Sequence, residues 1–376
     1  MTTVNKGLLA SKKILVIRYR FIGDTILTVP FLRNLRHSFP DAQIDVLVGP
    51  QSGEVLQGCP FVNRFITFDT TRFHKYDKGE GEAKSFWSYA KELRKEKYDL
   101  VFVLKRSWSS AFLALLTGAK YRIGYATEGR QILLTKGVPW NKHIHEVDST
   151  LEVLSGANLP IQDRFLDAWI SEEEDKSICA KAPELSRGKT KVLIHAAAAH
   201  PDKMYPLDRW AEVMKLLAPQ LNCDFYFSGA EQDYSLYEEL QTLACIKGFN
   251  LAGKLSLRES MALYRRMNVA LCVDSGPAHL SAAVGVPTVA LFGPTDPERW
   301  RPYGDSHLAL YNSELSCRPC NYNKTCQNRE CLTEFRPAKI AEACELVFQT
   351  RINFTPGNAQ PVQNDQLSPT ADPTNL

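Results

Sequence analysis

The sequence predicts an α/β protein made of two Rossmann-like, doubly wound domains that face a central cleft. Three observations lead to this prediction. The chain has 376 residues, its composition is that of a globular protein with 44% hydrophobic and 23% charged residues, and apolar strands alternate with amphipathic helices in two successive series. A chain of this length can form two domains, each large enough to bury a core.

The first series starts with an apolar strand at Lys13–Arg18, followed by a glycine-containing turn and a helix over about residues 24–39. Residues 74–97 are polar, with aromatic and apolar residues at helical spacing. Further strands are expected at Ile44–Val48, Phe65–Phe68 and Asp99–Leu104. Such alternation indicates parallel βαβ units.

The second series repeats this pattern from about Lys191. Its expected strands are Lys191–His195, Asp224–Phe227, Ala270–Val273 and Thr288–Phe292, and its expected helices lie near Trp210–Leu217, Tyr234–Ala244 and Ala278–Ala283. We therefore expect one doubly wound domain over residues 1–170, an acidic linker over 171–187, a second doubly wound domain over 188–353 and a disordered polar tail over 354–376. Ligands of doubly wound sheets bind beyond the carboxyl ends of the strands, so the turns after the strands should carry the chemistry.

Charge is distributed unevenly between the halves. Residues 1–150 contain 23 Lys and Arg against 14 Asp and Glu, whereas the remainder contains 22 against 28. A solvated basic surface and an anionic partner both explain this excess. No apolar run approaches the roughly 18–20 residues that span a bilayer. The first residues lack the apolar core and cleavage site of a secretory signal, so we expect a cytoplasmic protein.

The turn after the first strand contains Gly23 and Asp24. Gly23 permits a close backbone approach. Asp24 falls at a helix start, where it is either a capping residue or a general base that takes a proton from an acceptor hydroxyl.

Several turns of the second half contain candidate donor-binding residues. Lys203 follows the strand Lys191–His195, and Glu231 follows the strand Asp224–Phe227. The most specific segment, 274–297, follows the strand Ala270–Val273 and opens a helix, whose first N–H groups could bind phosphate. Its candidates are Asp274 for sugar hydroxyls, Ser275 and Gly276 for phosphate, His279 for phosphate or sugar, and Gly293 in the following turn.

These motifs resemble those of the ADP-heptose:lipopolysaccharide heptosyltransferases, glycosyltransferase family 9, which have the GT-B fold. The similarity extends from about Lys13 to Phe348. Its most specific parts are Arg18–Pro30, Lys203–Trp210, Ser228–Glu231 and Asp274–Pro297.

The resemblance implies an inverting transferase that moves a heptose from ADP-heptose to a sugar of the lipopolysaccharide inner core. Asp24 would be the general base, Lys203 would neutralise the leaving phosphates and Glu231 would read ribose hydroxyls. No cofactor or catalytic metal would be required. Some relatives carry hydroxyl residues where this chain has Ala196–Ala199, a difference that leaves the donor's identity open.

The implied acceptor is an anionic glycolipid, and basic side chains of the first half are candidates to bind it. Contact with the inner face of the cytoplasmic membrane would occur through this acceptor, and no nucleic-acid partner is expected. The candidate acceptor-binding residues are Arg20, Lys105, Arg106, Arg122 and Arg130.

Four cysteines lie close together late in the sequence, at Cys317, Cys320, Cys326 and Cys331. This spacing suits a structural zinc or an iron–sulfur centre, with disulfides as the alternative in an oxidising compartment.

Other classes of function compete with this one. A family member could use another nucleotide sugar or glycan acceptor, or the scaffold could bind sugar nucleotides without catalysis. A nucleotide-dependent oxidoreductase would need a G-x-G-x-x-G turn after the first strand, but that turn contains only Gly23.

Overall fold

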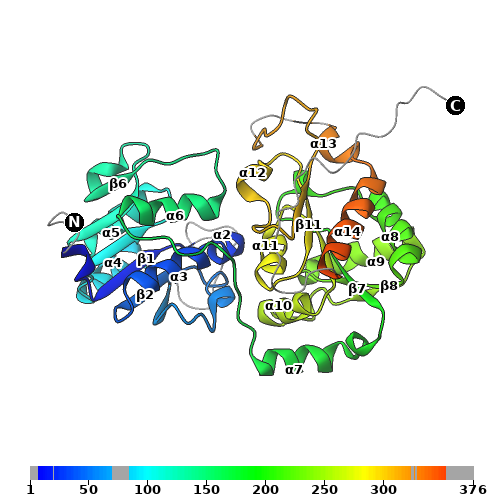
Figure 1. The fold of residues 1–376 in the computed structure, drawn as a ribbon, viewed down its shortest axis with the longest axis horizontal. Helices are drawn as coiled ribbons and strands as arrows, with labels where there is room; N and C mark the ends of the chain where they lie inside the picture. Colours follow the sequence, from blue (N-terminus) through cyan, green and yellow to red (C-terminus); the bar gives the residue numbers. More distant parts are fainter. Residues whose placement is uncertain (1–6, 20, 70–83, 323–325, 327, 353–376) are drawn as a thin grey trace.

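The computed structural model describes residues 7–19, 21–69, 84–322, 326 and 328–352. It contains two α/β lobes side by side, each built around one parallel sheet (Figure 1). This arrangement confirms the predicted fold class. Each sheet is enclosed by helices, and its central strands are almost fully buried because both faces are covered.

The first sheet has the strand order β3-β2-β1-β4-β5-β6, with every neighbouring pair parallel. Its strands are β1 (Lys13–Ile17), β2 (Gln43–Val48), β3 (Arg64–Thr67), β4 (Leu100–Val103), β5 (Tyr121–Tyr125) and β6 (Lys136–Val138). The helices of this lobe are α2 (Ile22–Ile26), α3 (Val29–Ser38), η1 (Glu54–Leu56), α4 (Phe86–Lys95), α5 (Trp108–Leu116), η2 (Arg130–Leu133) and α6 (Glu146–Gly156).

The second sheet has the order β12-β11-β10-β7-β8-β9 and is again parallel throughout. Its strands are β7 (Thr190–His195), β8 (Cys223–Phe227), β9 (Phe249–Asn250), β10 (Val269–Val273), β11 (Thr288–Leu291) and β12 (Leu308–Leu310). The helices of this lobe are η4 (Pro201–Lys203), α8 (Leu207–Leu221), η5 (Glu231–Asp233), α9 (Tyr234–Ala244), α10 (Leu257–Arg265), α11 (Gly276–Ala283), α12 (Pro297–Trp300), α13 (Glu330–Thr333) and α14 (Pro337–Ile352).

The stretch expected as an acidic linker contains the helix α7 (Glu172–Lys181) and the turn η3 (Pro183–Ser186). A capping box starts α7, because the Ser171 hydroxyl accepts from the Glu174 N–H while the Glu174 carboxylate accepts from the Ser171 N–H. The acidic residues that suggested a linker therefore form the first turn of a helix, where negative charge is favourable.

Helix α7 is held to the second lobe by ion pairs. Arg258 of α10 binds Glu174 through Nε, at 2.7 Å from Oε1, and Arg265 and Arg266 bind Asp175. The same Arg258 donates through Nη1 to the carbonyl of Glu54 in the first lobe, at 3.2 Å. One buried guanidinium thus contacts the connecting helix and the other lobe.

The lobes also touch where α2 packs against α11, midway along the interface (Figure 1). The helix expected over about residues 24–39 is in fact two helices, α2 and α3. Pro30 occupies the first turn of α3, where its missing N–H is tolerated, so a new helix starts there rather than continuing α2.

Candidate active site between the two lobes

Both sheets have the same strand order, so each has one point where the order of the chain reverses. This point lies between β1 and β4 in the first sheet and between β7 and β10 in the second. A crevice opens at such a point beyond the carboxyl ends of the strands, and ligands bind there. Asp24 follows β1 and Asp274 follows β10, which places each beside its own crevice.

Asp24 lies in the first turn of the five-residue helix α2, and its side chain is 21% exposed. Its Oδ1 is 3.5 Å from Arg18 Nη2, and its backbone carbonyl accepts from Arg18 Nε at 3.3 Å. The N-cap residue of this helix is Phe21, which makes no side-chain capping bond. Asp24 lies three residues later, so it does not occupy the N-cap position. Arg18 therefore contacts both the side chain and the backbone carbonyl of Asp24 and holds this residue at the carboxyl edge of the first sheet.

Gly23 brings this turn against the donor side of the interface. A Cβ atom added to Gly23 would lie 2.8 Å from His279 Cδ2, closer than real Cβ contacts. On the other side, a Cβ on Gly276 would be 3.6 Å from Ile22 Cγ2. The Gly276 distance is an ordinary van der Waals contact, so it is Gly23 that allows α2 and α11 to approach closely. This contact brings Asp24 to the first turn of α11.

Lys203 and Asp274 form an ion pair at the second crevice. Lys203 Nζ is 2.7 Å from Asp274 Oδ2, and the same oxygen accepts from the Thr295 hydroxyl at 2.5 Å. Burial by itself would lower the pKa of Lys203, but the Asp274 carboxylate and the Tyr322 hydroxyl raise it above its usual value. The ammonium therefore stays charged although only 22% of its side chain is exposed.

His279 is buried in α11, one turn after Asp274, and burial lowers its pKa to about 4. Its ring is neutral near pH 7, and among the described residues its Nδ1 has no hydrogen-bond partner. A neutral imidazole with an unused nitrogen can exchange a hydrogen bond with a ligand hydroxyl or phosphate.

The remaining residues predicted in this segment have different surroundings. Ser275 donates through its hydroxyl to the Val273 carbonyl at 3.1 Å, which leaves its backbone N–H as the group available to phosphate. Gly293 is buried, and a Cβ there would lie 2.8 Å from Leu332 Cδ1. Its carbonyl accepts from Arg318 Nε at 2.5 Å, so Gly293 serves the packing of the turn.

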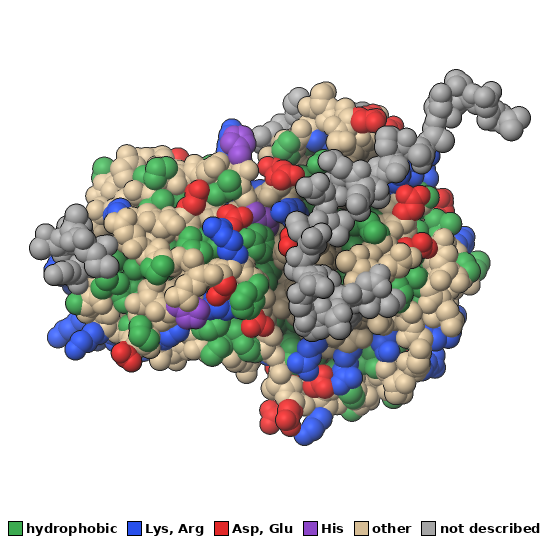
Figure 2. All heavy atoms as spheres, in the orientation of Figure 1, with side chains coloured by type: hydrophobic (Ala, Val, Ile, Leu, Met, Phe, Trp, Pro, Cys, Tyr) green, Lys and Arg blue, Asp and Glu red, His purple; other side chains and the backbone are tan. Residues whose placement is uncertain are grey.

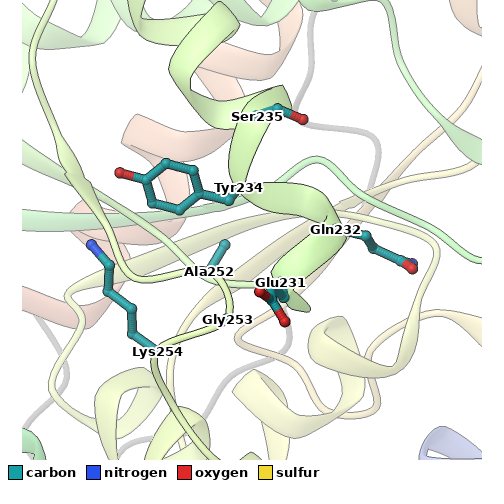
Figure 3. Close-up of a pocket in the computed structure, with 7 residues that line it drawn as sticks. All are labelled: Glu231, Gln232, Tyr234, Ser235, Ala252, Gly253 and Lys254. Atoms are coloured by element: carbon teal, nitrogen blue, oxygen red, sulfur yellow. The ribbon is translucent and has the colours of Figure 1, made fainter.

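Glu231 lines an open hollow of about 600 Å³ at the carboxyl ends of β8 and β9. Glu231 lies beside Gly253, which has φ +73°, and the Lys254 side chain extends towards the Tyr234 ring, with its Nζ 5.1 Å from the ring centre (Figure 3). The lining residues are Glu231, Gln232, Tyr234, Ser235, Ala252, Gly253 and Lys254. An aromatic ring, an acid and a base around one hollow can contact a nucleoside through stacking and ribose hydrogen bonds.

The predicted acceptor-binding residues fall into two groups. Lys105 and Arg106 follow β4 at the first crevice, where Lys105 Nζ lies 4.0 Å from the centre of the Tyr19 ring and the Arg106 guanidinium lies 3.8 Å from that of Trp140. Arg20 lies outside the described residues. Lys105 and Arg106 thus lie beside the predicted cleft and remain candidates for acceptor binding.

The side chains of Arg122 and Arg130 bind other groups of the first lobe. Arg122 lies at the start of β5, away from the carboxyl edge, and its guanidinium donates to the carbonyls of Ala119 and Leu133. Arg130 is 2% exposed and pairs with Glu128 at 3.1 Å. These contacts favour structural roles for both arginines in place of the predicted acceptor binding.

Two loops of the second half contain residues whose surroundings could not be predicted from the sequence. Ala196 and Ala197 are buried, and the N–H of Ala196 donates to the Tyr237 hydroxyl at 3.2 Å, so alanine there reflects packing. The Tyr322 ring stacks near His200, with centroids 4.3 Å apart, and its hydroxyl bonds Lys203. Sequence reasoning missed Tyr322 because it lies 119 positions from Lys203.

The cysteine cluster is not supported as a metal centre. The four thiols are free, with Cys317 and Cys326 exposed and Cys320 and Cys331 partly buried. Within the described ranges, no three His, Cys, Asp or Glu side chains are grouped as a metal ion would require. The Cys326 sulfur instead accepts from the Arg329 N–H at 3.2 Å.

Three side chains beside Asp24 were not singled out from the sequence: Arg18, Glu146 and Arg299. Glu146 Oε1 is 2.7 Å from Arg18 Nη2, and its Oε2 accepts from Arg299 of the other lobe. Arg18 ends the first strand, so its position at the carboxyl edge was a usable signal. Figure 2 shows acidic, basic and histidine side chains gathered where the lobes meet.

Known proteins are similar to this chain in architecture and in sequence. The model of glycosyltransferase family 9 (heptosyltransferase) matches residues 86–331. Lipopolysaccharide heptosyltransferase 3 of Escherichia coli K12 is 27% identical over 358 residues, covering 91% of this chain and 99% of that protein.

Solved structures agree on the fold. A glycosyltransferase family 9 protein from Veillonella parvula superposes with a TM-score of 0.76 at 22% identity, over 90% of this chain and 97% of that one. Escherichia coli heptosyltransferase WaaC with ADP superposes with a TM-score of 0.68 at 19% identity, over 89% and 99%. Two facing parallel-sheet lobes of this kind form the GT-B fold. The chain belongs to glycosyltransferase family 9, the heptosyltransferases. Among its described helices, none is long and apolar enough to cross a membrane.

Proposed function

We propose that this heptosyltransferase moves a heptose from ADP-heptose to a sugar of the lipopolysaccharide inner core, with inversion at the anomeric carbon. The observation that carries the proposal is the contact between α2 and α11, which brings Asp24 to the helix that starts beside Asp274. The ADP complex of WaaC and the name of the Escherichia coli relative support the donor and the acceptor class.

The chemistry follows from two groups of opposite charge on the two sides of the cleft. Asp24 takes the proton of the acceptor hydroxyl as its oxygen forms a bond to the anomeric carbon. On the opposite face, the bond from that carbon to the diphosphate oxygen breaks, and the diphosphate leaves with the electron pair. Lys203 stabilises the negative charge that grows on the diphosphate, and this route requires no metal ion in the chemical step.

On the donor side, the N–H groups at the start of α11 would hold phosphate, and Glu231 would accept from ribose hydroxyls in the hollow beside Tyr234. On the acceptor side, Lys105 and Arg106 would meet the anionic groups of the glycolipid. The enzyme would work in the cytoplasm and reach the membrane through this lipid acceptor.

Asp24→Asn tests the assignment of the base. The variant should still bind the donor but lose turnover by about 10²–10⁴-fold, the usual contribution of a general base. Product is measured by mass spectrometry with ADP-heptose and a core acceptor. Asp41→Asn, on an exposed turn before β2, is the control and should keep full activity. An active Asp24→Asn enzyme would remove Asp24 from the mechanism.

A family member with another donor is the competing function, because the accessible residues of the loop after β7, Ala198 and Ala199, have no hydroxyl that could bind phosphate. A thermal-shift comparison of ADP-, UDP-, GDP- and CMP-sugars separates the two. Stabilisation by ADP-heptose above the others supports the proposal, and a stronger response to another nucleotide sugar favours the alternative.

A further inference from the structure

A chain of buried charges leads from Asp24 to the other lobe. Arg18 lies between Asp24 and Glu146, with its Nη2 3.5 Å from the first carboxylate and 2.7 Å from the second. Glu146 then accepts from Arg299 through its other oxygen. The side chains of Arg18, Glu146 and Arg299 are 6%, 3% and 7% exposed, so solvent screens these interactions little.

Arg299 belongs to the donor side of the molecule. It lies in α12, four residues after Thr295, whose hydroxyl donates to Asp274. One short segment therefore contacts the donor-site carboxylate at one end and Glu146 of the first lobe at the other. In Figure 1, α12 faces the start of α6 across the interface.

Further hydrogen bonds hold α12 against the residues at the start of α6. Arg299 Nη1 donates to the carbonyls of Asn141 and Ile144, each at 3.3 Å. His145 Nε2 lies 2.9 Å from the Arg301 carbonyl. The Tyr303 hydroxyl donates to Asp148 at 3.0 Å. Several bonds from the residues around α12 thus converge on the first turn of α6.

Burying such an ion chain gains little stability on its own, because desolvation offsets the attraction between the charges. Its position beside the base points to another purpose. We propose that Glu146 and Arg299 are positioning residues, which hold Arg18 against Asp24 and so make the geometry of the base depend on the apposition of the two lobes. This proposal rests on the proposed role of Asp24.

The electrostatic consequence can be derived group by group. Asp24 pairs with Arg18, and Arg18 in turn interacts with Glu146 and Tyr125. Glu146 also interacts with Arg299 and Arg106. His279 of α11 and Glu54 of η1 belong to the elements that pack against α2. Glu146 is the buried anion that compensates the nearby guanidinium groups.

In the pH profile of kcat/KM, the acid limb is the range in which activity falls as Asp24 becomes protonated. Two single variants should shift this limb in opposite directions. Glu146→Gln keeps the shape of the side chain, and its carbonyl can still accept from Arg18, so Arg18 stays beside Asp24. The variant removes a negative charge, so the guanidinium groups stabilise the Asp24 carboxylate more and the limb moves to lower pH. Arg299→Met removes a positive charge, so the limb moves to higher pH. Each shift should be about 0.5–1 pH unit, with turnover lowered about tenfold or more. The double variant removes one charge of each sign, so its limb should return towards that of the unchanged enzyme.

Arg258→Met is the matched control. Arg258 is also a buried arginine that joins the lobes, through Glu174 and the Glu54 carbonyl, but it has no bond to the Asp24 chain among the described residues. Its loss should lower the melting temperature and leave the acid limb in place. If Glu146→Gln does not fold, Arg299→Met and the double variant still carry the test.

Each outcome has one meaning. Opposite shifts in the two single variants, with none in Arg258→Met, support the positioning role. Lower rates with an unmoved acid limb would show that Glu146 and Arg299 act only on stability, which overturns the proposal. Full turnover by Asp24→Asn would instead reject the base itself, so the two failures are distinguishable.

Discussion

At the scale of single residues, the donor site depends on the ion pair between Lys203 and Asp274. Both side chains are mostly buried, and the Thr295 hydroxyl adds a third bond to the same carboxylate. A lysine held in this way is positioned before the diphosphate arrives, so little reorganisation is needed as negative charge develops.

Lys203→Met should therefore lower kcat by about 10²–10³-fold, the usual effect of losing one preorganised charge-stabilising group. It should also lower the melting temperature, because Asp274 keeps its buried charge without a cation. Steady-state kinetics and thermal melts measure the two effects. Lys189→Met is the control, since Lys189 pairs with Asp224 at 3.4 Å while 51% exposed. Equal losses in both variants would contradict the special role of Lys203.

The sequence could predict some of these residues but not their partners. Asp24, Lys203 and Asp274 each follow an apolar strand, and parallel sheets place such positions at one edge. The bond from Arg18 to Glu146 joins residues 128 positions apart. No local sequence pattern indicates such a pair, because only the packing of α6 against the first sheet brings the two residues together.

At the scale of elements, the contact between α2 and α11 controls how closely the two half-sites meet. Gly23→Ala would place a Cβ 2.8 Å from His279 Cδ2, and α2 would have to move away from α11. Turnover should fall about 10–100-fold, since small displacements of reacting groups are costly. Gly188→Ala is the control, because nothing lies within 4 Å of its Cβ position. Unchanged kcat in Gly23→Ala would show that the contact does not set the site.

Prediction of elements succeeded where long apolar runs mark buried strands, as at β1, β4 and β10. It missed β5, because Arg122 and Gly124 interrupt its apolar character, and β9, which has only two residues. The acidic start of α7 resembled a linker for a related reason: only one residue of that helix, Ile178, is buried. Weakly amphipathic helices leave little periodicity to recognise.

At the scale of the whole molecule, buried histidines make the stability depend on pH. Burial lowers the pKa of His145, His195 and His279 to about 4 in the folded protein, against about 6.5 for an exposed histidine. The unfolded chain therefore binds more protons, and stability present above pH 6.5 is lost as the pH falls towards 4.

Between pH 7 and pH 5 each of these histidines should cost about 2 kcal/mol of unfolding free energy. Denaturant titrations over this range measure the loss. His195→Gln should reduce the pH dependence, whereas His37→Gln, which alters an exposed residue, should leave it as it was. Identical pH profiles for the unchanged protein and His195→Gln would contradict the assignment.

The segment before α7 connects the two lobes. Within a few residues, its hydrogen bonds to the first lobe give way to hydrogen bonds to the second. Arg33 of the first lobe holds Asp163 at 2.7 Å and the Phe165 carbonyl at 2.8 Å, whereas Arg258 of the second lobe holds the Trp169 carbonyl. A rotation of one lobe against the other would therefore pivot near Ala168. In Figure 1, α7, which follows this segment, lies at the bottom of the interface and α12 near the top, so a small opening angle would separate Arg299 from Glu146 well before it separated α10 from the first lobe.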